Sequence, residues 1–114
     1  MHMYRATTPK HTFIFDVDPA ETFDKILITY AQNGKIILEK NKEELSFSET
    51  MNECCGRQYT ASLELTQEET NMFSAGSRGV VSIQVRVRTY DGQVLASDEK
   101  HISVKNVLND EVLL

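Results

Sequence analysis

The feature that most constrains the fold of this 114-residue chain is a hydrophobic repeat of period two. The longest repeat runs from Val81 to Arg88, where valine and isoleucine alternate with serine, glutamine and arginine. Shorter repeats have the apolar members Phe13, Phe15 and Val17; Ile26, Ile28 and Tyr30; Leu45 and Phe47; and Tyr59, Ala61, Leu63 and Leu65. Because successive side chains of a β-strand point to opposite faces, this period predicts strands with one buried face.

Two dipeptides predict tight turns between these strands. Asn33-Gly34 separates predicted strands at 25–32 and 35–40, and both residues tolerate the positive φ angles of a type I′ turn. Asp91-Gly92 turns the chain into segment 93–105. The residues of that segment predicted to point inward are Val94, Ala96, Ile102 and Val104. The polar interruption at 97–100 predicts a β-bulge.

One short helix is predicted between the strands. Thr66 and Glu69 have the spacing of a capping box, in which each residue bonds the backbone of the other. We expect Met72 and Phe73 to dock this helix on the core and Gly76 to end it.

The pattern as a whole predicts one all-β domain, an antiparallel immunoglobulin-like β-sandwich of about seven strands with one short helix before the penultimate strand. A small open barrel is the second architecture compatible with it. A single core suffices at this length, so residues 1–114 are expected to form one domain, with residues 1–10 and 107–114 as extended tails.

Charge and hydropathy argue against nucleic-acid and membrane partners. The formal net charge is -5, and no segment gathers lysine and arginine into a block that could follow a phosphate backbone. The densest basic group is expected on a solvated sheet face and consists of Arg86, Arg88, Lys100 and Lys105. No secretory signal pattern precedes the first strand, so a cytosolic location, or export without a signal, is expected. Met1 and His2, which precede a second methionine, are interpreted as a cloning remnant.

The sequence contains only partial matches to catalytic and metal-binding patterns. The run Phe13–Asp18 resembles the start of the haloacid dehalogenase-like phosphatases, but Ala20 stands where that family has threonine, and the alternating strands and helices of its parallel sheet are missing. We therefore predict no enzyme, and a turn at Asp18-Pro19. A calcium site lacks its loop spacing, so a solvated acidic loop is expected at Asp16, Asp18, Glu21 and Asp24.

The cysteines, histidines and glycines likewise predict no cofactor. Cys54 and Cys55 are adjacent in a polar loop predicted at 50–56, too close for an ordinary disulfide, and are interpreted as ordinary thiols. The histidines are isolated from one another, so no zinc site is predicted. The glycines of segment 75–79 precede a strand rather than a helix, which favours a flexible connection over a phosphate loop. No catalytic, cofactor-binding or metal residue is therefore assigned.

The segment after the last predicted strand is apolar. Its candidate assembly contacts are Val107, Leu108, Val112, Leu113 and Leu114. Such a segment is unfavourable in water, so it either folds back or docks on a neighbouring molecule. Strand addition at a sheet edge is a common way for β-domains to assemble, which favours the neighbour.

Several spaced runs of the chain resemble a known group of proteins. They are Tyr4–Phe13, Ile28–Gln32, Leu65–Thr70, Ile83–Val87 and Ala96-Ser97. Together they resemble small proteins encoded in prophage structural modules of Gram-positive bacteria and, more distantly, the immunoglobulin-like N-terminal domain of phage baseplate upper proteins. The resemblance implies a virion or tail-associated structural component without catalytic residues. It does not include the Cys54-Cys55 pair.

Two hypotheses of function follow from the sequence. The first is a non-catalytic structural or assembly protein whose partners are other phage structural proteins or further copies of itself, cytoplasmic in the host before assembly into a virion. The second is a stand-alone ligand- or carbohydrate-binding module, for which Tyr4, Tyr59 and Tyr90 are the available aromatic residues. The sequence identifies neither the partner nor the oligomeric state.

Overall fold

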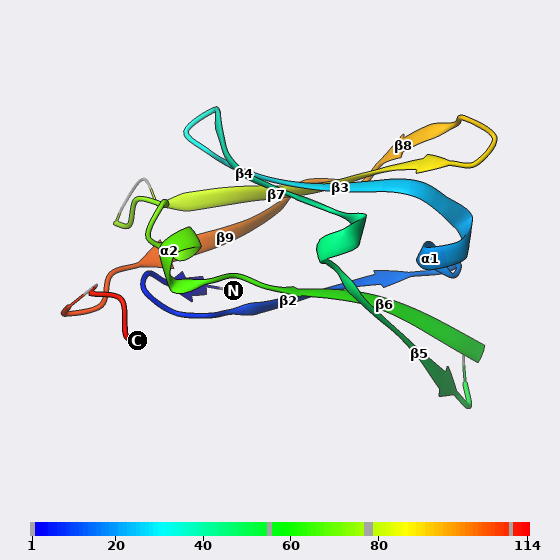
Figure 1. Ribbon diagram of the computed structural model, residues 1–114, viewed down its shortest axis with the longest axis horizontal. Helices are drawn as coiled ribbons and strands as arrows, with labels where there is room; N and C mark the ends of the chain where they lie inside the picture. The colour runs from blue at the N-terminus through cyan, green and yellow to red at the C-terminus, as the bar shows by residue number, and fades with distance from the viewer. Residues whose placement is uncertain (1, 55, 77–78, 110) are drawn as a thin grey trace.

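The computed structural model of the protein describes residues 2–54, 56–76, 79–109 and 111–114, and Figure 1 shows two layers of strands. Met1, Cys55, Ser77, Arg78 and Asp110, which belong to regions interpreted above, lie outside the described residues. In chain order the elements are β1 (His2–Tyr4), β2 (Lys10–Phe15), α1 (Pro19–Thr22), β3 (Phe23–Gln32), β4 (Lys35–Asn41), the 3-10 turn η1 (Lys42–Glu44), β5 (Ser46–Asn52), β6 (Gly56–Glu64), α2 (Gln67–Thr70), β7 (Val80–Thr89), β8 (Val94–Ala96) and β9 (Lys100–Lys105).

The strands form two sheets of unequal width. The larger has the order β1-β9-β7-β3-β4, with β8 also paired to β7, and the smaller has the order β2-β6-β5. All neighbouring pairs are antiparallel except β1 and β9. The predicted all-β sandwich is confirmed, with more strands than the seven expected. The described residues differ from the prediction in having one parallel pair and two short helices rather than one, and α2 precedes β7, which two further strands follow.

The core lies between the sheets and is built from the period-two residues. Ile26, Ile28 and Tyr30 of β3 alternate with more exposed neighbours, as do Val81, Ile83, Val85 and Val87 of β7. The smaller sheet covers them with Ala61 and Leu63 of β6, followed by Leu65. Burying one such large apolar side chain contributes roughly 1.5–3 kcal/mol, so these positions dominate the stability of the fold.

The predicted turn between β3 and β4 is confirmed. Asn33 has φ 54° and Gly34 has φ 74°, both in the left-handed region that a type I′ turn requires. The polar loop predicted at 50–56 is mostly wrong, because β5 extends to Asn52 and β6 starts at Gly56. Backbone pairing continues along this hairpin, as in the pair of Thr50 with Gln58, although it lies beyond the apolar core.

The N-terminal tail predicted for residues 1–10 is also wrong for the described residues. β1 pairs in parallel with β9, placing Met3 opposite Val104, and the Met3 side chain is only 2% exposed. Lys10 already belongs to β2. A three-residue strand is too short for a period-two pattern, and its partner is about 100 positions away, so only tertiary pairing reveals it.

The predicted bulge at 97–100 is confirmed and has a consequence for side-chain direction. Arg86 pairs with Ala96 while Ile83 pairs with Lys100, so three steps along β7 match four along the opposing strand. An extra residue reverses which side chains face inward. Val94 and Ala96, predicted inward, are therefore exposed opposite Arg88 and Arg86, whereas Leu95 is opposite the buried Val87.

The same one-residue shift in register places the basic residues that were predicted to share one solvated face on different faces of the larger sheet. Arg86 and Arg88 alternate with buried residues of β7 and face outward. Lys100 is opposite the buried Ile83 and shares the inner side of the larger sheet with Ile102. The prediction of one solvated face is therefore wrong for Lys100.

The two short helices are fixed by caps. The Glu69 N–H donates to Thr66 Oγ1 over 3.1 Å, and the Thr66 N–H donates to Glu69 Oε1 over 2.9 Å, which confirms the capping box. α2 ends at Thr70 rather than at Gly76; Phe73 is buried, but Met72 is 52% exposed, so the docking role predicted for Met72 is wrong.

Asp18 caps α1 by accepting from the Ala20 N–H over 3.1 Å, so the chain forms one helical turn where a simple turn was predicted. No helix in the described residues is long and apolar enough to cross a bilayer.

Gly79 provides a test of the packing between β9 and the start of β7. A Cβ at this position would lie 2.9 Å from the Val104 carbonyl oxygen and 3.0 Å from backbone atoms of Ala75 and Gly76. We expect Gly79→Ala to lower the free energy of unfolding by about 1–3 kcal/mol, as overpacking does. Gly34→Asn is the control: its positive φ strains a side chain, but asparagine adopts this conformation more readily than most residues and a Cβ meets no atom there, so the loss should be smaller. Equal urea midpoints for Gly79→Ala and wild type would contradict this packing.

Candidate functional site

A groove of about 1000 Å³ opens along one side of the sandwich, where the smaller sheet ends before the larger one. β2 is an edge strand of the smaller sheet, because among the residues that the structure describes it pairs with β6 alone. Across from it lie β7, β8 and β9 of the larger sheet. The groove is therefore a direct result of the unequal widths of the two sheets.

The groove has an apolar interior and a polar rim. Phe13 and Phe15 line it from β2, and Ile83, Val85 and Val87 line it from β7. Leu95, which the bulge turns to this side, lines it from β8. Lys10, Lys100 and Asp98 lie among the residues around it, so basic side chains outnumber acidic ones there.

The backbone of β2 has hydrogen-bonding groups directed away from its partner. The Leu65 N–H donates to the Pro9 carbonyl over 3.0 Å, which makes residues 9 and 65 a hydrogen-bonded pair. In an antiparallel ladder such pairs alternate, so residues 11, 13 and 15 also bond toward β6. The N–H and C=O groups of Lys10, Thr12 and Ile14 consequently face the open edge, where an added strand could pair with them.

The predicted assembly residues lie apart from this groove. Segment 107–114 has no regular secondary structure in its described residues. Leu108, Leu113 and Leu114 are exposed, whereas Val107 and Val112 are half-buried. The Gln67 side chain holds the Leu113 backbone through two hydrogen bonds of 2.7 Å, one to its carbonyl and one from its N–H. The Leu113 side chain remains 78% exposed despite this contact.

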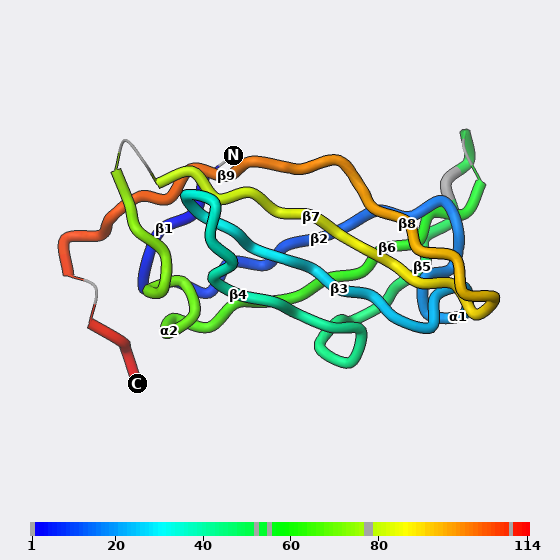
Figure 2. The backbone as a smooth tube through the Cα atoms, turned by 90° about the horizontal axis from the view of Figure 1, so that it is seen from above, coloured from blue at the N-terminus to red at the C-terminus, as the bar shows by residue number. Residues whose placement is uncertain are grey.

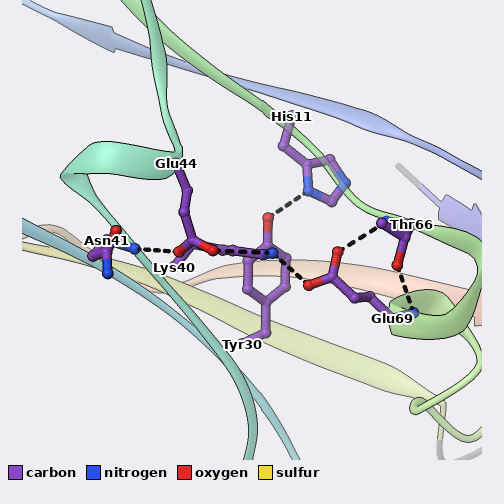
Figure 3. Close-up of polar contacts among 7 residues, drawn as sticks. All are labelled: His11, Tyr30, Lys40, Asn41, Glu44, Thr66 and Glu69. Atoms are coloured by element: carbon purple, nitrogen blue, oxygen red, sulfur yellow. Dashed lines mark hydrogen bonds and ion pairs between the residues drawn. The ribbon is translucent and has the colours of Figure 1, made fainter.

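A polar pair lies between the sheets next to the groove (Figure 3). The hydroxyl of the fully buried Tyr30 lies 2.6 Å from Nδ1 of His11, a residue that also lines the groove. Burial lowers the pKa of His11. Burial, with the nearby charge of Glu69, raises the pKa of Tyr30. Both groups are therefore neutral at pH 7, which suits a structural hydrogen bond.

A charged pair, whose Glu69 also acts on Tyr30, joins β4 to α2 (Figure 3). Lys40 Nζ contacts Glu69 Oε2 and lies 3.6 Å from Glu44 Oε1. Burial, the largest influence, raises the pKa of Glu69, but bonds to Lys40 and Thr66 outweigh it and leave the pKa lowered. Burial likewise lowers the pKa of Lys40 most, yet Glu69 and Glu44 together leave it raised. The pair is ionised and closes this side of the sandwich.

The other residues considered from sequence do not converge on one site. Asp18 caps α1, and Asp16, Glu21 and Asp24 are exposed. In the described residues no three histidine, cysteine, aspartate or glutamate side chains gather as metal ligands. Cys54 is exposed.

The candidate tyrosines are also dispersed. Tyr4 lies on β1, whereas Tyr90 lies in the β7–β8 turn at the opposite end of the molecule, as Figure 2 shows. Lys42 Nζ lies 5.8 Å from the centre of the Tyr90 ring. The groove was therefore not predicted from the sequence. The one sequence signal related to it was the polar interruption at 97–100, which changes the faces to which Leu95 and Lys100 point.

His11 makes stability depend on pH. An unfolded histidine takes up a proton near pH 6.5, whereas the folded one resists it because its pKa is lowered, so stability falls as pH falls below that value. We expect the urea midpoint to fall between about pH 7.5 and pH 5 and His11→Gln to flatten this decline. His101→Gln, at an exposed histidine of β9, is the control and should retain it. An unchanged slope in His11→Gln would contradict the assignment.

The charge of Glu69 and its role in the capping box of α2 can be tested separately. Glu69→Gln keeps a side chain that can complete the capping box but removes the charge facing Lys40, so we expect a loss of about 1 kcal/mol or less. The loss should persist between the ordinary pKa values of glutamate, 4.5, and lysine, 10.5, since the pair contributes only where both are charged. Glu68→Gln, at the exposed neighbouring position, should change little in the same denaturation series.

Comparison with known proteins assigns no function to this groove or segment. No protein-family model and no curated protein matches the sequence. The groove and the segment are accordingly interpreted from their own residues.

Proposed function

We propose that this protein is a non-catalytic structural component that acts through protein-protein contacts. The observation that carries the proposal is the exposed apolar segment 107–114, whose Leu108 and Leu114 side chains have no cover in the described residues. Exposed apolar surface is unfavourable in water and commonly marks a surface that a partner covers. The open edge of β2 offers a second surface of the same kind.

The polar groups between the sheets support a structural role. Tyr30 is hydrogen-bonded to His11, and Lys40 is paired with Glu69. These four side chains have shifted pKa values, and each of them has a partner within the protein. A catalytic acid or base is instead expected to face a substrate. These contacts stabilise the sandwich: Nδ1 of His11, which borders the groove, is engaged by Tyr30, and the Lys40–Glu69 pair lies outside the groove lining.

The proposed setting is a prophage virion, in which the protein is a tail-associated or other structural component. The resemblance to prophage structural proteins and to the immunoglobulin-like domain of baseplate upper proteins supports this setting. In this proposal the sandwich is of immunoglobulin-like type, its partners are other phage structural proteins or further copies, and it resides in the host cytoplasm before assembly.

A second candidate is a ligand- or carbohydrate-binding module, and the groove of about 1000 Å³ is the observation that favours it. Its apolar interior suits a sugar poorly, because stacking on exposed aromatic rings is the usual mode and the tyrosines are dispersed. Saturable binding on a glycan array, abolished by Tyr90→Ala, would favour this candidate over the first.

The proposed setting is tested in particles rather than in the isolated protein. Phage particles released after induction of a bacterium that carries the gene are purified on a density gradient, and each fraction is quantified by mass spectrometry. We expect the protein to co-migrate with the particles at a constant ratio to their major structural proteins. A cytosolic host enzyme is the control and should remain in the soluble fractions. Recovery of the protein only with that enzyme would contradict the proposal.

A further inference from the structure

We propose that the open edge of β2 receives segment 107–114 of a second copy of this chain as an added strand. The inference rests on the proposed structural role and specifies a contact by which two copies of the protein would assemble. It combines three features: a free strand edge, an apolar groove behind that edge, and an exposed apolar segment elsewhere on the same molecule.

The edge has the backbone groups that strand addition needs. The N–H and C=O groups of Lys10, Thr12 and Ile14 point away from β6. This follows from the hydrogen bond between Leu65 and Pro9, because hydrogen-bonded pairs alternate along an antiparallel ladder. A strand placed there would widen the smaller sheet from three strands to four. Its inward side chains would contact Phe13, Val85 and Leu95, which line the groove. The added strand would thus bury apolar surface and satisfy backbone groups at the same time.

The segment has the length and pattern of such a strand. β2 has six residues and the segment has eight, so at about 3.3 Å per residue the segment can cover the whole edge. In an extended conformation Leu108, Asp110, Val112 and Leu114 fall on one face. The three apolar side chains match the apolar interior of the groove, and the aspartate between them would face the side on which Lys100 lines it.

Charge also matches between the two surfaces. The segment carries two acidic residues and no basic one. The groove has Lys10 and Lys100 around it, against the single acidic side chain of Asp98 among its lining residues. This complementarity favours the segment of this chain over an apolar peptide without charge.

The geometry favours a second copy over the molecule's own segment. Figure 2 shows the chain leaving the end of β9 and crossing the end of the molecule, away from the long side that β8 and β9 form with β2. Gln67 holds the Leu113 backbone there. These two exposed hydrogen bonds contribute little net stability, because water can replace them, so release toward a neighbour is inexpensive.

Two variants block the two sides of the contact separately. Thr12→Pro removes the outward N–H of the edge while leaving the bonds from β2 to β6, because proline is tolerated on edge strands when its nitrogen faces outward. The double variant Leu108→Ser, Val112→Ser removes two of the three apolar side chains on that face of the segment. Ile36→Ser is the matched control, since it removes a 59% exposed apolar side chain of β4, outside the groove lining.

The experiment is sedimentation velocity on the full chain over a wide range of concentration. Wild type and Ile36→Ser should self-associate, and each blocking variant should weaken association on the order of tenfold or more. A mixture of the two blocking variants should associate again, because one supplies an intact segment and the other an intact edge. Circular dichroism spectra and urea midpoints establish that each variant is folded.

The inference is overturned if wild type remains monomeric throughout, or if the mixture associates no better than its two members alone. Saturable binding of a small apolar ligand in the groove that leaves wild type monomeric would also overturn it. The particle measurement separates this outcome from that of the proposed function. A monomer found in particles refutes only the added strand, whereas an associating protein absent from particles refutes only the virion role.

Discussion

The burial of the β3 and β7 inner faces under β6 is the interaction on which the rest of the structure depends. Ile28, Tyr30 and Val81 are completely enclosed there, and Leu65 is enclosed at the end of β6. These residues fix the separation and register of the sheets. The outer strands are attached to this central region by pairing: β4 pairs with β3, β2 and β5 pair with β6, β8 and β9 pair with β7, and β1 pairs with β9.

The two long sides of the sandwich are closed in different ways. On the β4 side, η1 carries the chain from one sheet to the other, and the Lys40–Glu69 pair joins β4 to α2. Lys42 adds hydrogen bonds to the Ala20 and Phe23 carbonyls at the adjoining end. On the β9 side no strand of the described residues covers the larger sheet beyond β2, so that side remains open. The asymmetry explains why the candidate contact surface lies where it does.

Local sequence patterns predicted most of the core and the turns. The alternation in 81–88 identified the buried face of β7, and Asn33-Gly34 identified a hairpin with two positive φ angles. Thr66 and Glu69 identified the start of α2. Each of these signals depends on residues within a few positions of one another, which is why the sequence alone was sufficient. Met72, in contrast, was assigned to the core although only Phe73 is buried, because α2 ends at Thr70 and the helix does not extend to these two residues.

What the sequence by itself determined was the period of the strands, the tight turns, the helix cap and the apolar character of 107–114. Only the tertiary structure decided how many strands each sheet has, that β1 pairs with β9, and that one extra residue turns Leu95 and Lys100 toward the groove. The physical reason is the separation along the chain of the residues that interact. Backbone conformation and side-chain alternation are set by neighbours in the chain, whereas sheet width and open edges arise from pairing between segments far apart, which no local pattern encodes.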